Sequence, residues 1–405
     1  MPARPESPAA SPAASPAASA VSPSDRAARA TQKRFAGRRQ RTGSQSLLLT
    51  DPTNVRYLTG FTGDSTALLL WSERRTRRAV LVSDGRYETQ LQEQCPGVEA
   101  VIRPTGQKMS DALAAQIAAT GQTFHVEWDR VTVNVYRELS EAIAACDKVG
   151  RSGLVSPTEA ATAETFSVST MRRVKDAEEV AAIRRAVRAS EQTFAYMRSR
   201  LRPDISEFEL AADGEHVARQ FGMRGWSFPA IVAAGDRAAL PHYEPGDGSM
   251  GDDSHVLIDW GVREPGGYVS DMTRVLLRRK TPKKIETIYR AVHQAYEAAV
   301  AAIRPGVSAG DVDAVARDTL DDLGFGKRFS HSLGHGIGLN VHEGPGLRPG
   351  SDDELAAGMV VTVEPGVYLP GYGGVRLEND VLVTDDGVES LSTLPLDLEA
   401  NRLDW

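Results

Sequence analysis

Alternating apolar and polar segments begin near residue 47 and continue to about residue 165. Short apolar runs bounded by turn-forming residues predict strands at 47–49, 67–71, 78–84 and 123–129. Apolar residues at helical spacing predict helices at 86–94, 110–119 and 132–145. Strands and helices that alternate in this way are typical of an α/β domain, which we expect to occupy residues 44–168.

A second domain, residues 169–405, is expected to begin with a long amphipathic helix. Asp176 and Glu179 have the spacing of a helical capping box. Apolar residues then recur at helical spacing from Val180 to Leu201. Capping and periodicity agree, so we predict that this segment is one continuous helix.

The second domain contains an internal repeat. The first long helix ends in LRPDIS and a second helical stretch ends in IRPGVS, which places Pro203 and Pro305 102 positions apart. The serine of each copy, Ser206 or Ser308, can cap a following helix. A helical pair followed by a strand-rich stretch thus occurs twice, and we predict an α+β domain with an internal pseudo-twofold duplication.

Charge separates the start of the chain from the rest. Residues 1–43 carry eight Arg or Lys against Glu6 and Asp25, a net of +6, so the remainder of the −7 chain carries −13. The Ala/Pro/Ser tract SPAASPAASAVSPS cannot bury enough apolar surface to fold, and we expect 1–43 to be a disordered, low-complexity basic tail. A targeting segment or a polyanion-binding arm is the alternative. The acidic remainder disfavours nucleic acid as a partner.

The sequence shows no membrane span, no secretory signal and no cysteine pattern typical of disulfides or metal sites. No stretch approaches the roughly 18 consecutive apolar residues of a membrane span, and the N-terminus has no apolar run of a secretory signal. The two cysteines, Cys95 and Cys146, sit in unrelated contexts, which argues against a disulfide framework or a thiolate metal site. We therefore expect a soluble, cytoplasmic protein that does not bind membranes.

Each half of the duplicated domain supplies two acidic residues in apolar surroundings. The segment HVLIDWGVREPGGYVSDMTRVLL contains Asp259 and Asp271, twelve positions apart, and MVVTVEPGVYLPGYGGVRLENDVLV contains Glu364 and Glu378, fourteen apart. Asp259 and Glu364 each end an apolar run typical of a buried strand. Burying four carboxylates together is costly unless cations neutralise them. The pattern therefore predicts a divalent metal site.

Histidines are concentrated next to these acids. The segment HSLGHGIGLNVHEGPG (331–346) holds three of the eight histidines of the chain. His335 is flanked by glycines that leave room for an ion, which makes it the expected ligand; His331 and His342 are expected behind the ligands or facing the substrate. Four carboxylates and one imidazole suit two divalent ions, with Mn²⁺ favoured and Co²⁺ or Zn²⁺ as alternatives.

Together these segments resemble the pita-bread metallopeptidase family, in its aminopeptidase P and Xaa-Pro dipeptidase (prolidase) branch. The resemblance covers about residues 45–400 and rests on YLTGF, DWGVREPGGYVSDMTR, HSLGHGIGLNVHEGP, VVTVEPGVY and GGVRLEND. It implies a creatinase-like N-terminal domain followed by a pita-bread catalytic domain. The implied metal ligands are Asp259, Asp271, His335, Glu364 and Glu378, with Asp271 and Glu378 bridging two ions. The implied active-site groups are His242 in LPHYEP, His331, His342, Tyr368 and Arg376.

The implied activity is hydrolysis of the bond between a free N-terminal residue and a following proline. We expect Glu364 to carry a proton to the leaving nitrogen and His342 to stabilise the oxyanion. His242 and His331 are expected to position the substrate, Tyr368 and Arg376 to form a hydrogen-bonding pair, and the protein to be a homodimer.

Two other classes of function stay open. A creatinase-like hydrolase uses the same fold without a metal, and a non-catalytic binding protein can also use it. Both are expected to have lost metal ligands, whereas this sequence keeps all five.

Overall fold

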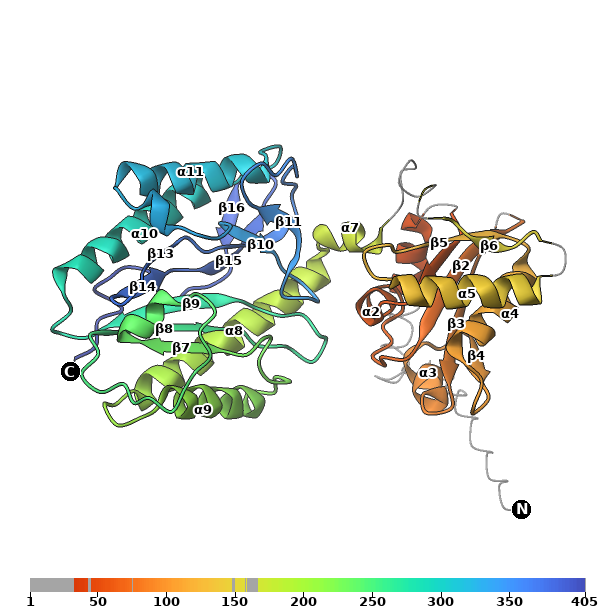
Figure 1. Ribbon diagram of the computed structural model, residues 1–405, viewed down its shortest axis with the longest axis horizontal. Coiled ribbons are helices and arrows are strands. Elements are labelled where there is room, and N and C mark those ends of the chain that lie inside the picture. Colours follow the sequence, from red (N-terminus) through yellow and green to blue (C-terminus); the bar gives the residue numbers. More distant parts are fainter. Residues whose placement is uncertain are drawn as a thin grey trace, which may run out of the picture. The chain divides into compact units, whose positions relative to one another are not determined.

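The computed structural model describes residues 33–42, 45–74, 76–147, 150–156, 158 and 167–404. The chain divides into two compact units, Met1–Thr165 and Phe166–Trp405 (Figure 1). No helix within the described ranges combines the length and the apolar character that crossing a membrane requires.

The first unit is built on a six-stranded sheet in the order β4-β3-β2-β1-β5-β6. Its strands are β1 (Leu47–Leu49), β2 (Ala67–Glu73), β3 (Thr76–Asp84), β4 (Glu99–Arg103), β5 (Thr123–Val126) and β6 (Gly153–Leu154). Its helices are α2 (Pro52–Thr59), α3 (Glu88–Gln94), α4 (Met109–Thr120) and α5 (Val133–Cys146). The core forms where α4 and α5 pack their apolar residues against the sheet. The expected strands and helices are present, while α2, β4 and β6 were not predicted.

The start of this unit differs from the expected disordered tail. Residues 33–41 are helical. Phe35 and Arg38 are buried, and the Arg38 guanidinium lies 4.0 Å from the centre of the Tyr57 ring. Arg77 Nη2 donates to Thr42 Oγ1 at 3.0 Å. An Arg-rich composition indicated a solvated tail, but single residues of this segment pack on the folded unit. The Ala/Pro/Ser tract lies outside the described residues.

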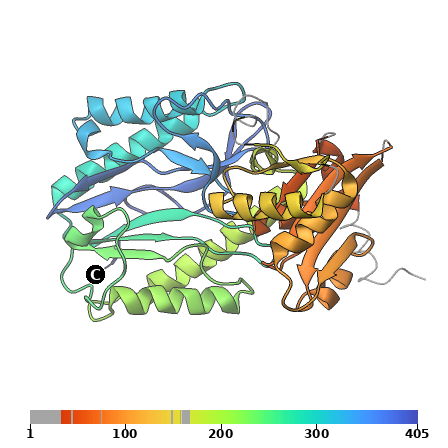
Figure 2. The same ribbon diagram turned by 45° about the vertical axis from the view of Figure 1, so that its right-hand side comes forward.

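In the second unit, strands form an inner layer between two pairs of helices. Helices α8 (Ala177–Arg200) and α9 (Glu207–Gln220) lie on one side, and α10 (Lys283–Ala302) and α11 (Ala309–Asp322) on the other (Figures 1 and 2). A short helix, α7 (Val168–Arg173), precedes them, and two 3₁₀ turns are η1 (Gly235–Ala239) and η2 (Gly326–Arg328). Between the helices lie a three-stranded sheet, a five-stranded sheet and a two-stranded hairpin.

The three sheets divide the strands of the second unit as follows. The three-stranded sheet contains β7 (Ile231–Ala234), β8 (His255–Trp260) and β9 (Met272–Leu277). The hairpin contains β13 (Gly366–Leu369) and β14 (Gly373–Arg376). The five-stranded sheet contains β11 (Glu343–Leu347), β10 (Gly334–Gly336), β12 (Val360–Val363), β15 (Asn379–Val383) and β16 (Val388–Ser390), in that order.

The predicted duplication is present in the helices and in the strand pairs. Ser206 caps α9 by accepting from the backbone N–H of Glu209, and Ser308 caps α11 by accepting from that of Gly310. The first half pairs β8 with β9 and the second pairs β12 with β15, both antiparallel. Each pair brings two acidic residues to one end of its strands, which positions the site.

Candidate active site

One cavity in the second unit gathers the acids and histidines predicted from the sequence. Its volume is about 500 Å³, which is in the range of pockets that bind small ligands. The predicted residues in its wall are Asp259, Asp271, His335, Glu364, Glu378, His242, His331, His342 and Arg376. Its apolar wall residues are Phe228, Pro229, Ala230, Ile231, Pro241, Tyr243, Pro245 and Val341.

Asp259 and Asp271 come from neighbouring strands of the three-stranded sheet. Asp259 lies near the end of β8, and Asp271 immediately precedes β9. Both side chains are buried. Asp259 Oδ2 accepts a hydrogen bond from Arg376 Nη2, whereas its Oδ1 has no hydrogen-bond partner in the part of the chain that the structure describes. A buried carboxylate oxygen without a donor is a position that a cation can fill.

Glu364 and Glu378 occupy the corresponding places in the other half. Glu364 directly follows β12 and Glu378 directly precedes β15. Thr273 Oγ1 donates to Glu378 Oε2 at 2.6 Å. Thr362 Oγ1 donates to Glu364 Oε1 at 3.4 Å. A threonine hydroxyl group therefore holds each of the two carboxylates.

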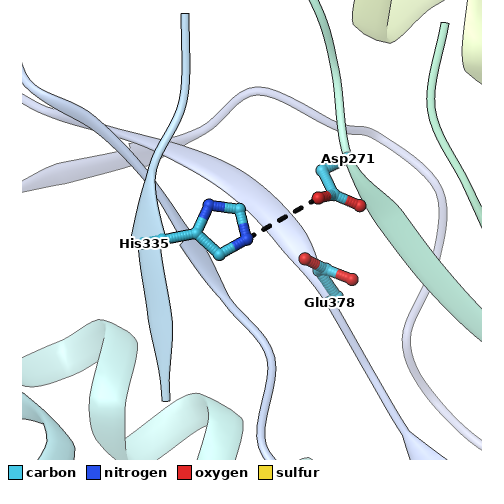
Figure 3. Close-up of side chains that lie close together, drawn as sticks. All are labelled: Asp271, His335 and Glu378. Atoms are coloured by element: carbon cyan, nitrogen blue, oxygen red, sulfur yellow. Dashed lines mark ion pairs between the residues drawn. The ribbon is translucent and has the colours of Figure 1, made fainter. Parts of the chain in front are cut away.

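His335 lies on β10, and its ring points toward Asp271 and Glu378 (Figure 3). Its Nδ1 is 3.1 Å from the Gly336 carbonyl oxygen, an acceptor, so we assign the ring proton to Nδ1. Nε2, with its lone pair, lies 3.7 Å from Asp271 Oδ2 and 3.4 Å from Glu364 Oε1. One ligand atom from each of Asp271, His335 and Glu378 lies within 4.8 Å of the other two. These three residues can hold a metal ion.

The electrostatics of the cavity also fit divalent cations. Burial raises the pKa of Glu364 to about 8. Burial and repulsion from neighbouring carboxylates raise the pKa values of Asp271 and Glu378 well above their usual range. Burial likewise raises the pKa of Asp259, although Arg376 opposes the shift. A divalent cation would reverse these shifts by neutralising the charge. Burial lowers the pKa of His335 to about 4, which keeps its imidazole neutral and able to bind metal.

The other histidines of the cavity differ in their surroundings. Both ring nitrogens of His331 are engaged: Nδ1 lies 2.8 Å from the Ser332 carbonyl oxygen and Nε2 lies 2.9 Å from Tyr368 Oη. The His342 ring centre lies 4.4 Å from that of His335. His242 is exposed on the loop after η1. His331 is therefore fixed from within the protein, whereas His242 and His342 face open space.

Arg376 connects several of these groups. Its Nη1 donates to Tyr368 Oη at 2.9 Å and to the Pro241 carbonyl oxygen at 3.3 Å. Its Nε donates to Thr273 Oγ1 at 3.1 Å, and Nη2 to Asp259. Its guanidinium group thus contacts the carboxylate of Asp259 directly and is connected to that of Glu378 through the hydroxyl group of Thr273.

Sequence reasoning did not identify Thr273, Thr362 or Asp380. Besides the two threonine contacts above, Asp380 Oδ2 accepts from the backbone N–H of Asp271 at 3.1 Å. Each of the three lies two positions from a predicted ligand. Residues two apart on a strand point to the same face, so this spacing was the signal that could have found them.

Comparisons with known proteins agree with this geometry. Residues 181–385 match Metallopeptidase family M24, and residues 32–157 match the Creatinase/Prolidase N-terminal domain. The chain is 33% identical over 361 residues to the uncharacterized peptidase YqhT of Bacillus subtilis, covering 88% of this chain and 96% of that protein.

Two solved structures show the same fold over most of both chains. An Xaa-Pro dipeptidase from Bacillus anthracis has a TM-score of 0.80 and 33% identity, covering 92% of this chain and 99% of its own. An X-Pro aminopeptidase from Thermotoga maritima has a TM-score of 0.77 and 32% identity, covering 89% and 99%. The chain belongs to metallopeptidase family M24, as a pita-bread, metal-dependent peptidase with a creatinase-type N-terminal domain, and its substrate is a peptide.

Proposed function

We propose that this peptidase uses two divalent metal ions to cleave the bond between an N-terminal residue and a following proline. Asp259, Asp271, His335, Glu364 and Glu378 would hold the ions, with Asp271 and Glu378 shared between them. The observation that carries the proposal is the meeting of three buried carboxylates, the partly buried carboxylate of Glu364 and one neutral imidazole in one cavity. Four carboxylates carry −4, which two divalent ions balance.

The ligand set favours hard or borderline ions. Oxygen donors predominate, which suits Mn²⁺, with Co²⁺ or Zn²⁺ as alternatives. Metal analysis of protein reconstituted in each ion, combined with peptidase assays before and after chelation, tests the proposal. A metal-independent creatinase-like hydrolase would keep its activity in chelator, and a non-catalytic binding protein would show none in either state.

The bound ions would supply Lewis acidity that polarises the scissile carbonyl group and lowers the pKa of a water molecule. Glu364 would accept the proton of the attacking water and return it to the proline nitrogen. Burial, and then His242, lower the pKa of His342, so a neutral ring can donate its N–H to the oxyanion. His242 would hold the substrate directly. His331 would also position the substrate, and Tyr368, whose hydroxyl group hydrogen-bonds to His331 and accepts from Arg376, would hold the His331 ring in place.

Specificity for proline is supported by the similar structures, an Xaa-Pro dipeptidase and an X-Pro aminopeptidase, and by the cavity wall. Phe228, Ile231, Tyr243 and Val341 provide apolar surface against which a pyrrolidine ring can pack. We would assay Ala-Pro-Ala, Ala-Ala-Ala and N-acetyl-Ala-Pro-Ala with added Mn²⁺ or Co²⁺. Cleavage of Ala-Ala-Ala as fast as Ala-Pro-Ala, or comparable cleavage of the acetylated peptide, would contradict the Xaa-Pro assignment. The assignment to a metallopeptidase would still hold.

The charges of the wall favour peptides longer than dipeptides. Arg376 is the one Arg or Lys among the wall residues, all of which the structure describes. Its nitrogens are already bonded to Asp259, Thr273, Tyr368 and Pro241. A dipeptide carboxylate, one residue from the scissile bond, would lose water in the cavity without gaining a cationic side chain, which is costly.

The comparison of Ala-Pro with its C-terminal amide isolates this charge. We expect kcat/KM to be higher for Ala-Pro-amide and for Ala-Pro-Ala than for Ala-Pro. Preferred cleavage of the free dipeptide would instead identify a dipeptidase, with the carboxylate bound by a group outside this wall.

We also place the protein in the cytoplasm as a homodimer. Both cysteines are free, which is consistent with a reducing compartment. The dimer is implied by the resemblance to the family, and light scattering coupled to size-exclusion chromatography would measure it.

A further inference from the structure

Glu207 is a fully buried carboxylate outside the cavity wall. It is the first residue of α9 and has no exposed surface. Its Oε1 accepts from the backbone N–H of Ala234 at 2.8 Å and from Arg237 Nε at 2.6 Å. Its Oε2 accepts from Tyr243 Oη at 2.7 Å and from the backbone N–H of Gly246 at 3.4 Å.

All four donors belong to the segment 234–246, which carries His242 between β7 and β8. This segment also lies against β14. A Cβ on Gly374 would come within 2.2 Å of the Ala238 carbonyl oxygen, so the two backbones approach closely. Arg376, also on β14, donates to the Pro241 carbonyl oxygen. The segment is therefore fixed between the start of α9 and the metal-site hairpin.

We propose that Glu207 is a positioning residue that sets the place of His242 and Tyr243 in the substrate cavity. The proposal rests on the proposed function, because that function assigns His242 to substrate binding. A single carboxylate satisfies two backbone and two side-chain donors on both sides of His242. Charge-assisted hydrogen bonds of this kind are stronger than neutral ones, so their loss should loosen the whole segment.

A capping role alone does not account for these contacts. Glu209, on the same helical turn, already forms the capping box of α9 by accepting from the backbone N–H of Ser206 at 2.9 Å. Glu209 makes no hydrogen bond to the segment 234–246 among the described residues. It is therefore a matched control that removes a charge from the same helix end without removing a side-chain hydrogen bond to the His242 segment.

Glu207→Gln keeps the size of the side chain but removes its charge and presents an amide to the Gly246 N–H. We expect KM for Ala-Pro-Ala to rise about tenfold, the size expected for weakening one charge-assisted hydrogen bond. kcat should change by less than about twofold, since loss of binding shared by ground and transition states acts on KM. Metal content should match wild type. Glu209→Gln should leave KM and kcat unchanged.

Arg237→Lys gives a second, milder test, because Arg237 lies outside the cavity wall and bridges Glu207 to Asp253 Oδ2 at 3.0 Å. Hydrogen exchange of residues 235–246 reports the loosening without any assay of activity. Faster exchange there in Glu207→Gln, and not in Glu209→Gln, supports the proposal. Unchanged exchange, or equal effects of both variants, would overturn it. Failure of wild type to cleave proline peptides would instead reject the proposed function.

Discussion

Asp271 and Glu378 approach His335 from the two halves of the duplicated unit (Figure 3). Because each is expected to serve both ions, Asp271→Ala or Glu378→Ala should reduce bound metal from two ions toward one or none. Activity should fall by several orders of magnitude with it. Metal analysis by plasma mass spectrometry, on protein dialysed after reconstitution, measures the stoichiometry. Two tightly bound ions in either variant would refute the bridging assignment.

His342→Ala is the contrasting substitution at the same site. The His342 ring lies beside His335, with 4.4 Å between the ring centres, and is not one of the proposed metal ligands. We expect this variant to keep both ions and to lose about 10²–10³ in kcat, the usual effect of removing one oxyanion donor. A loss of metal equal to that of Asp271→Ala would show that His342 is a ligand.

The metal-free protein should become less stable as pH rises from 6.5 to 8. Burial raises the pKa of Glu364 to about 8 and that of Asp271 and Glu378 well above normal. The folded chain therefore binds more protons than the unfolded chain, whose carboxyl groups ionise near pH 4. Stability then falls with pH by about 1.4 kcal/mol per unit for each extra proton.

The range from pH 6.5 to 8 avoids an opposite contribution of the histidines to the pH dependence of stability. Burial lowers the pKa values of His331 and His335 to about 4, so below about pH 6.5 the unfolded chain binds more protons at these rings and stability rises with pH. Urea midpoints measured in chelator at pH 6.5 and 8, then with saturating Mn²⁺, test the prediction. Equal decreases with and without metal would show that the carboxylates are not the titrating groups.

At the residue scale, the sequence predicted which groups would meet but not what holds them. The four acids could be found because each borders an apolar run and the duplication sets them in pairs. Glu207 could not, since its donors lie 27 to 39 positions away, from the end of β7 to the loop after η1, and show no periodic pattern. The contact of His331 with Tyr368 also depends on packing between separate segments.

Among the elements, β10 shows why glycines surround His335. A Cβ on Gly334 would lie 2.0 Å from the Thr362 carbonyl oxygen, and one on Gly336 2.2 Å from that of Gly344. Both atoms belong to backbone that cannot move as a flexible side chain does. The sequence suggested that these glycines leave room for an ion, whereas the structure shows that they leave room for neighbouring backbone.

Gly334→Ala and Gly336→Ala should each destabilise the protein by about 1–3 kcal/mol or more, as expected for overpacking. Gly346→Ala is the control on the adjacent strand β11, because its Cβ would meet nothing closer than 3.6 Å. Thermal unfolding of the metal-free proteins separates packing from lost metal binding. Wild-type stability of Gly334→Ala would mean that β10 is less tightly enclosed than the structure indicates.

The longest elements were the most predictable. The capping box of α8 and the serine caps of α9 and α11 are formed by the residues that the sequence indicated. The short helix α2 was missed because its 8 residues are too few to show a repeat of apolar positions at helical spacing. Asp51 nevertheless caps this helix by accepting from the backbone N–H of Asn54. Strand order within the sheets was also beyond the sequence, since it depends on pairings between separate segments, such as that of Leu47 in β1 with His125 in β5.

For the whole molecule, the site residues all belong to one unit, whereas the basic start of the chain belongs to the other. From composition alone, residues 1–43 were predicted to form one disordered tail. The helix at 33–41 divides that stretch, because Phe35 and Arg38 are buried. The two parts should therefore respond differently to deletion.

Deletion of residues 1–32 should leave thermal unfolding and peptidase activity unchanged, because the Ala/Pro/Ser tract has no periodic apolar pattern and no site residue. Deletion of 1–42 should destabilise the first unit, because it exposes the surface that Phe35 covers, worth about 1.5–3 kcal/mol, and removes the Arg38 contact with Tyr57. Differential scanning calorimetry of metal-loaded proteins measures both. Phe35→Ala in the full-length chain should reproduce much of the larger effect, since it removes the buried ring and keeps the backbone. If both deletions leave the transition unchanged, the helix at 33–41 contributes nothing to stability, and the whole basic segment behaves as the solvated tail that its composition suggested.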